Sequence, residues 1–152
     1  YNTHAQAHHG SAKYDGIRVQ QMAELATFVN ESRLKTAPAL LVGDMNCSPG
    51  EADYERAVEG AGLVRLMNLD TRIDHIFGVQ DDAYEFEVID TIEIQETVSI
   101  GDKEFELSDH SGYLSTIQIT PTKQPAEHVS RAPSPTYSLF FPSLLCVSAP
   151  LR

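Results

Sequence analysis

Apolar residues between positions 16 and 31 recur with the spacing of one face of an α-helix. The apolar positions are Met22, Leu25, Ala26 and Val29. Steps of three and four residues put such side chains on one side of a helix, while charged and amide residues, Arg18 among them, occupy the other sides. The pattern predicts an amphipathic helix over residues 16–31.

A second strand and helix follow directly. Residues 39–43 form a continuous apolar run of the length expected for a strand buried on both faces. Ser48 and Glu51 then have the spacing of a capping box, with proline between them at the first helical position. This signal predicts a helix over residues 49–59, which ends at the glycines that follow it.

The rest of the patterned chain favours β-structure. Residues 1–3 have the character of a strand end, and residues 72–78, 86–95 and 113–119 have the composition and alternation of extended chain. Strand, helix, strand, helix and then several strands describe a layered α/β sandwich.

The character of the chain changes after position 120. Six of the eight prolines lie between Pro121 and Pro150, mixed with Ser, Thr and Lys. We expect residues 121–152 to be a disordered tail attached to a domain of residues 1–120. The apolar patch at 139–145 is too short and too interrupted to span a membrane, and no transmembrane segment is expected elsewhere.

Composition and charge narrow the function only slightly. The 152 residues suffice for one core, and a formal charge of −11 with only 11 Lys and Arg argues against tight nonspecific binding to nucleic acid. Acidic balance suits a divalent metal, although a merely soluble acidic surface explains it equally well. Cys47 and Cys146 form neither a disulfide framework nor a zinc pattern, and the cell compartment stays open.

The first candidate for chemistry is Asp44 with Asn46, in the segment Gly-Asp-Met-Asn directly after the buried strand. Their spacing points both side chains the same way from the carboxyl end of the strand, where α/β proteins commonly bind ligands. Aspartate can orient a nucleophilic water, and an amide can donate to a phosphate oxygen. An Asx turn leading into a helix cap is the structural alternative.

Asp109 and His110 are the second candidate, just before the last predicted strand. A carboxylate binds metal or accepts a proton, and an imidazole exchanges protons near neutral pH. A surface loop with an incidental histidine explains the same residues without function.

Asp74 is the third candidate, because alternation places Ile73, His75 and Phe77 on the opposite face and leaves an acid within an apolar strand. It either pairs with a cation such as Arg72 or orients the imidazole of His110. A fourth candidate, His4, lies at a strand end, where a solvated histidine is the plain alternative.

The order of these segments resembles the endonuclease/exonuclease/phosphatase superfamily. The segments are N-T-H at 2–4, R-V-Q-Q-M-A-E-L at 18–25, G-D-M-N at 43–46, R-I-D-H-I-F at 72–77 and S-D-H at 108–110. The resemblance covers residues 1–119 and implies the C-terminal half of a four-layer α/β sandwich, with two packed sheets flanked by helices. The missing N-terminal half would supply a metal-binding glutamate.

The resemblance also implies a metal-dependent phosphodiesterase, using Mg²⁺ or Mn²⁺ as a Lewis acid. The implied roles are water activation for Asp44, phosphate binding for Asn46 and His4, general acid–base catalysis for His110, orientation of His110 for Asp74, and metal contact for Asp109. The first motif and the helix are more similar to sphingomyelinases than to abasic-site nucleases, so a phospholipid is the expected substrate. The alternatives are a deoxyribonuclease-like endonuclease and a noncatalytic fragment or pseudoenzyme.

Overall fold

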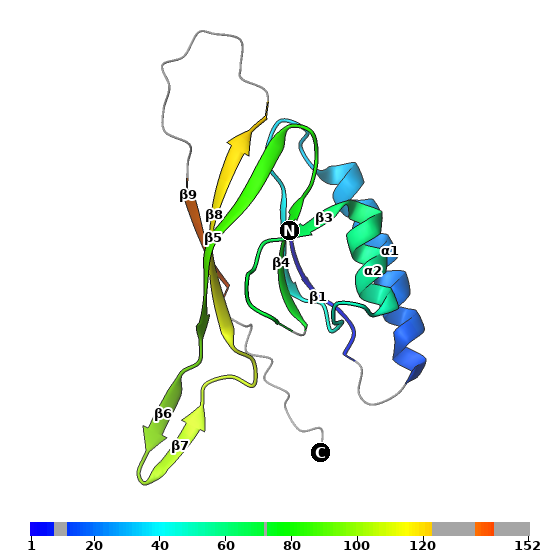
Figure 1. Cartoon of the computed structure of the whole chain (residues 1–152). Coiled ribbons are helices and arrows are strands. Elements are labelled where there is room, and N and C mark those ends of the chain that lie inside the picture. The colour runs from blue at the N-terminus through cyan, green and yellow to red at the C-terminus, as the bar shows by residue number, and fades with distance from the viewer. Residues whose placement is uncertain (8–11, 72, 123–135, 142–152) are drawn as a thin grey trace.

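A computed structural model describes residues 1–7, 12–71, 73–122 and 136–141 (Figure 1). In chain order the elements are β1 (Asn2–His4), η1 (Ala12–Tyr14), α1 (Asp15–Ser32), β2 (Leu40–Asp44), α2 (Ala52–Ala61), β3 (Leu63–Arg65), β4 (Asp74–Val79), β5 (Tyr84–Ile94), β6 (Thr97–Ile100), β7 (Lys103–Glu106), β8 (Gly112–Pro121) and β9 (Thr136–Phe141).

The strands form two larger sheets and a hairpin. Sheet A has the order β1-β2-β4-β3, in which β1 is parallel to β2 and the other neighbours are antiparallel. Sheet B has the antiparallel order β5-β8-β9, and β6 pairs with β7 alone. In Figure 1, α1 and α2 cover one side of sheet A, sheet B lies on its other side, and the β6–β7 hairpin projects from the body.

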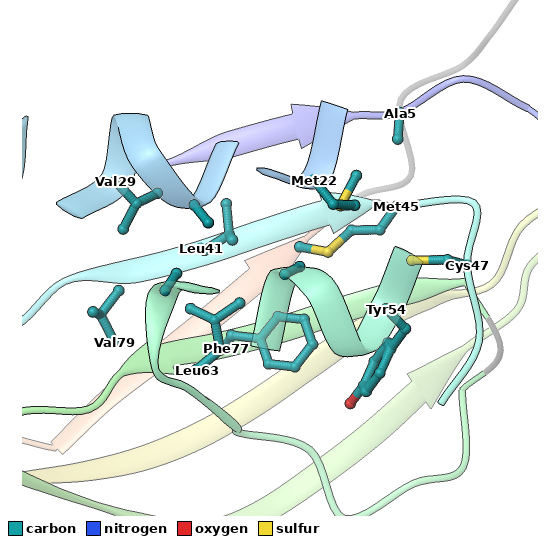
Figure 2. Packing of buried hydrophobic residues seen from close by; sticks show 13 residues of the cluster. Ala5, Met22, Val29, Leu41, Met45, Cys47, Tyr54, Leu63, Phe77 and Val79 are labelled. Carbon is teal, nitrogen blue, oxygen red and sulfur yellow. The ribbon is translucent and has the colours of Figure 1, made fainter. Parts of the chain in front are cut away.

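Sheet A is covered on both faces, because alternate side chains of its strands enter two different cores. Leu41 and Phe77 lie in the core under α1 and α2, together with Met22 and Val29 of α1 (Figure 2). Ile76, the neighbour of Phe77, lies in a second core with Ile117 and Ile119 of β8. The predicted α/β class is therefore confirmed, and the described elements form three layers: helices, sheet A and sheet B.

Helix α1 agrees with its prediction in extent but not in every buried position. It spans Asp15–Ser32, against the predicted residues 16–31. Arg18 was expected on a polar face, yet its side chain is buried, and its Nε donates to Asp53 Oδ2 of α2 at 2.6 Å. A long cation can join a buried helical face when a carboxylate on the next helix neutralises it.

Helix α2 begins and ends later than the predicted residues 49–59. It spans Ala52–Ala61 and stops at Gly62, whose φ of 61° is the left-handed cap that glycine favours. Only half of the predicted capping box forms: the Glu51 carboxylate accepts the backbone N–H of Ser48 at 2.6 Å. Glu51 is the N-cap residue of α2, and its side chain makes no capping hydrogen bond to the helix.

The prediction of a disordered tail is wrong for Thr136–Phe141. These residues form β9, which pairs antiparallel with β8 from Tyr113↔Phe141 to Gln118↔Thr136. The rest of the predicted tail, residues 123–135 and 142–152, lies outside the described residues. Strands β3, β6 and β7 were also not predicted. Within the described ranges no helix has the length and apolarity to cross a membrane.

Gly43 sets how closely β1 approaches β2. Its φ is +145°, and a Cβ added there would overlap the carbonyl oxygen of Thr3 on β1. Because the overlapping atom belongs to the backbone, no side-chain rotation relieves it. Glycine at this position therefore brings the carboxyl ends of two strands together, and these ends carry His4 and Asp44.

Candidate active site

Three predicted site residues lie side by side at one edge of sheet A because of strand register. His4 pairs with Asp44 across the β1–β2 ladder, and Asp44 pairs with Asp74 across the β2–β4 ladder. Parallel strands β1 and β2 end here, and antiparallel β4 begins here. Hydrogen bonding of the sheet thus gathers residues from three separate parts of the sequence.

His110 joins this group from the segment before β8. Its Nδ1 lies 2.9 Å from Asp74 Oδ2, a hydrogen bond, and its Nε2 lies 3.8 Å from Asp44 Oδ2. On the other side of Asp44, the same Oδ2 lies 3.4 Å from His4 Nε2. The structure therefore brings these four side chains together at one edge of sheet A.

The two carboxylate oxygens of Asp44 serve different purposes. Oδ1 accepts the backbone N–H of Asn46 at 2.8 Å, which is the Asx turn considered as the structural alternative. Oδ2 faces the imidazoles of His4 and His110. The turn and the cluster are thus not alternatives, because the same carboxylate takes part in both.

Asn46 lies beside this group in a conformation that non-glycine residues seldom adopt. Its φ is +50°, and its Nδ2 donates to the backbone oxygen of Ala5 at 3.0 Å. A left-handed asparagine is held in place only when its surroundings determine it strongly, and such residues gather at functional sites. The bond to Ala5 also ties the loop after β2 to the loop after β1.

The charges of the group shift the pKa of its titratable members. Burial opposes a charge on His110, but the hydrogen bond and charge of Asp74, with the nearby charges of Asp44 and Asp109, outweigh it and raise the pKa of His110. Burial raises the pKa of Asp74, and the contact with His110 limits that rise. His110 therefore retains its proton to higher pH than an ordinary histidine.

Several supporting residues were not predicted from the sequence. Thr71 donates from its hydroxyl to the backbone oxygen of Asp74 at 2.6 Å, and Arg65 donates to the same hydroxyl at 2.9 Å. The Ser108 hydroxyl accepts the backbone N–H of His110 at 3.1 Å. Only the Ser108 contact had a sequence signal, since serine two residues before a loop position often accepts its N–H.

Asp109 and Cys47 lie differently from the central group. Asp109 is exposed, and it influences His110 by its charge without joining the cluster of ligand atoms. Cys47 is fully buried, and burial raises the pKa of its thiol to about 12. That thiol stays protonated near neutral pH and is not a candidate nucleophile.

A shallow hollow of about 300 Å³ opens beside His4, between β1 and α1. Its walls include Gln21, Leu25 and Phe28, but neither Asp44, Asp74 nor His110. Of the four clustered side chains, only His4 therefore lines this hollow.

Comparison with solved structures shows which known proteins share the fold. The fold is similar to the crystal structure of beta toxin from Staphylococcus aureus, with a TM-score of 0.51 and 16% identity, over 78% of this chain and 50% of that one. Sphingomyelinase C from Streptomyces griseocarneus matches with a TM-score of 0.45 and 15% identity, over 80% and 52%. The chain thus spans about half the length of these structures.

A comparison with curated protein sequences finds no match. The family model for the Endonuclease/Exonuclease/phosphatase family matches residues 2–110, which include the strand ends and His110. This chain belongs to the Endonuclease/Exonuclease/phosphatase family.

Proposed function

We propose that this chain carries the acid–base part of a metal-dependent phosphodiesterase with a sphingomyelinase-like substrate. The observation that carries the proposal is the hydrogen-bonded pair of His110 and Asp74 beside the Oδ2 of Asp44. A base oriented by one carboxylate and facing another is the arrangement needed to activate water.

The direction of the hydrogen bonds assigns a role to each nitrogen of His110. Ionised Asp74 only accepts, so Nδ1 of His110 carries the hydrogen that it receives. In the neutral ring Nε2 is then unprotonated and directed toward Asp44. Its 3.8 Å separation from Asp44 Oδ2 is too long for a direct hydrogen bond and suits a bridging water. We assign this water as the nucleophile, with His110 taking its proton.

Phosphate binding falls to Asn46 and His4. The amide nitrogen of Asn46 uses one N–H for Ala5 and has a second that can donate to a phosphate oxygen. The His4 side chain is 52% exposed, so a ligand can reach its imidazole. Both residues border Asp44, so a phosphoryl group bound by them would lie next to the proposed nucleophile.

The donor set fits a divalent metal of the Mg²⁺ or Mn²⁺ type. Ligand atoms of Asp44, Asp74 and His110 lie within 4.8 Å of one another, but the Asp74–His110 bond already occupies one atom of each partner. Carboxylate oxygens of Asp44 and, by proposal, exposed Asp109 remain, and Mg²⁺ commonly binds through one or two carboxylates with water and phosphate. A bound ion would stabilise negative charge on the phosphoryl group.

In line with the family resemblance, we also propose a further metal ligand, a glutamate that lies outside residues 1–152. This chain spans about half the length of the matching solved structures. We therefore expect little turnover by the chain alone and restored turnover by a form extended upstream. A phospholipid is preferred over nucleic acid, because 11 basic residues against 22 acidic ones weaken any contact with a phosphate backbone.

The test is hydrolysis of bis(p-nitrophenyl) phosphate, sphingomyelin vesicles and plasmid DNA by both forms, with Mg²⁺, Mn²⁺ or EDTA. We expect metal-dependent hydrolysis of the small diester and sphingomyelin by the extended form, lost in His110→Ala. Cleavage of DNA alone would replace the phospholipid assignment with a nuclease. No hydrolysis by either form, or activity unaffected by His110→Ala, would overturn the proposal.

A further inference from the structure

His75 is a buried histidine in β4 that the proposed chemistry does not use. Its side chain is 2% exposed, and the ring packs against Tyr54 and Phe77 with ring centroids 5.2 Å away in both cases. One nitrogen, Nε2, lies 2.9 Å from the backbone oxygen of Cys47. The other, Nδ1, is buried without a hydrogen-bond partner.

The contact with Cys47 fixes the tautomer of the ring. A backbone carbonyl only accepts hydrogen bonds, so Nε2 must carry the hydrogen. Nδ1 of the neutral ring is then a bare acceptor in an apolar setting, which costs free energy. A phenylalanine or leucine at this position would pack without that cost. Packing alone therefore does not explain a histidine at position 75. What the imidazole provides, and an apolar side chain would not, is the hydrogen bond to Cys47.

That contact holds the C-terminal end of the loop that carries Asp44 and Asn46. At its start, the Met45 N–H donates at 2.8 Å to the backbone oxygen of Ile73, two residues before His75 in the chain. In its middle, Asn46 adopts its left-handed conformation. At its end, Cys47 is held by His75. Figure 2 shows Met45, Cys47 and Tyr54 at one end of the helix-side core, so the loop is anchored in the same core that surrounds the imidazole.

We propose that His75 is a positioning residue, whose Nε2–H bond to Cys47 holds residues 44–47 in the conformation that presents Asp44 Oδ2 to the nucleophilic water and the Asn46 amide to the phosphate. The proposal rests on the proposed phosphodiesterase function for its kinetic consequence, but not for its structural one. The same strand that supplies Asp74 thereby also fixes the loop that supplies Asp44.

Three variants separate positioning from packing. His75→Leu keeps an apolar side chain and removes the donor. His75→Gln places an amide N–H at about the reach of Nε2 and restores it. Phe77→Leu is the matched control, because Phe77 is equally buried on the same face of β4 and packs on the same Tyr54 ring, yet donates nothing to the loop.

The first readout needs no enzymatic activity. Nitrogen-edited NMR of the 152-residue chain should show the Nε2–H tautomer for His75, and amide hydrogen exchange should be followed at Met45 and Asn46. We expect exchange at both amides to accelerate about tenfold or more in His75→Leu, to return toward wild type in His75→Gln, and to be unchanged in Phe77→Leu despite a lower melting temperature.

The second readout is kinetic, in whichever form hydrolyses bis(p-nitrophenyl) phosphate. We expect kcat to fall by about ten- to a hundredfold in His75→Leu with KM nearly constant, since small displacements of reacting groups have effects of that size. Wild-type exchange in His75→Leu, equal acceleration in Phe77→Leu, or no recovery in His75→Gln would overturn the proposal. If no form is active, the proposed function fails, and the exchange data alone decide the role of His75.

Discussion

Sheet A and the β6–β7 hairpin differ sharply in how their strands are covered. Side chains of sheet A enter a core on each face, and β4 is buried at every position from His75 to Val79. Every residue of β6 and β7 is exposed, including Ile100 and Phe105. His110 comes from the segment that follows this exposed hairpin, yet it meets Asp74 at the edge of sheet A. The site therefore combines residues of a sheet that is buried on both faces with a residue that follows an exposed hairpin.

Specific bonds link sheet A and the segment after β3 to His110 and to β5 and β8, the strands on either side of the hairpin. One link is the His110–Asp74 pair itself. A second is a buried hydroxyl chain, in which Asn68 N–H donates to Thr91, the Thr91 and Ser115 hydroxyls are 2.7 Å apart, and Ser115 donates to Leu66 O at 2.7 Å. This series of hydrogen bonds starts and ends in the segment after β3 and passes through β5 and β8 of sheet B. It therefore holds sheet B against the segment that leads toward Asp74.

The largest expected effect is that of Gly43→Ala. The added Cβ overlaps the backbone of Thr3, and β1 must move away from β2, which separates His4 from Asp44. We expect the free energy of unfolding to fall by about 3 kcal/mol or more and the phosphodiesterase activity to be lost. Urea denaturation measures the first quantity.

Gly101→Ala is the matched control in the hairpin. Gly101 also has a positive φ, +63°, but an added Cβ meets nothing within 4 Å. Only conformational strain remains, about 1–2 kcal/mol. Equal losses for Gly43→Ala and Gly101→Ala would show that the close approach of β1 to β2 contributes nothing of its own.

Ser115→Ala should have the next largest effect, because it breaks the hydroxyl chain between the sheets. The Leu66 oxygen loses its donor, and the Thr91 hydroxyl loses the Ser115 hydroxyl and keeps only the Asn68 N–H. We expect a loss of about 2 kcal/mol in the free energy of unfolding. Ser99→Ala, in exposed β6, should change it by less than about 0.5 kcal/mol. Equal changes in the free energy of unfolding for the two serine variants would refute a stabilising role for these buried hydroxyl hydrogen bonds.

A smaller effect is expected for the pH dependence of the His110 contact. The folded-state pKa of His110 is raised, so its protonated form is stabilised by folding. This contribution is complete below the unfolded-state pKa of about 6.5 and disappears as pH rises through the folded-state value. The difference in free energy of unfolding between wild type and His110→Asn should thus be larger at about pH 6 than at about pH 9. A difference that grows with pH would contradict the assigned contact.

Much of sheet A and of the site could be predicted because the sequence signals there are local. The apolar run at 39–43 and the alternation at 72–78 reflect strands covered on one or two faces, and β2 and β4 form where these patterns lie. Four polar residues that the sequence offered as candidates lie together, because sheet register aligns His4, Asp44 and Asp74, and His110 joins them through its bond to Asp74. Their chemical roles stay predictions.

Other features depend on contacts between distant residues and had weak or no local signal. Strand β3 has three residues, too few for a pattern. The β6–β7 hairpin did have a signal, alternation over 97–100 followed by Gly101-Asp102, a pair typical of two-residue turns. Strand β9 was hidden by the prolines around it. The bond from His75 to Cys47 spans 28 positions and follows only from the packing of the helix-side core.

The central claim is that His110 and Asp74 act as one unit in catalysis, and a double-mutant cycle tests it most directly. The measurement is kcat/KM for bis(p-nitrophenyl) phosphate in His110→Ala, Asp74→Ala and the double variant, in the form that shows turnover. We expect kcat/KM to fall about 10²–10⁴-fold in His110→Ala and to fall no further when Asp74→Ala is added, because Asp74 acts through His110. Losses that multiply in the double variant would contradict it, since Asp74 would then act independently of the imidazole.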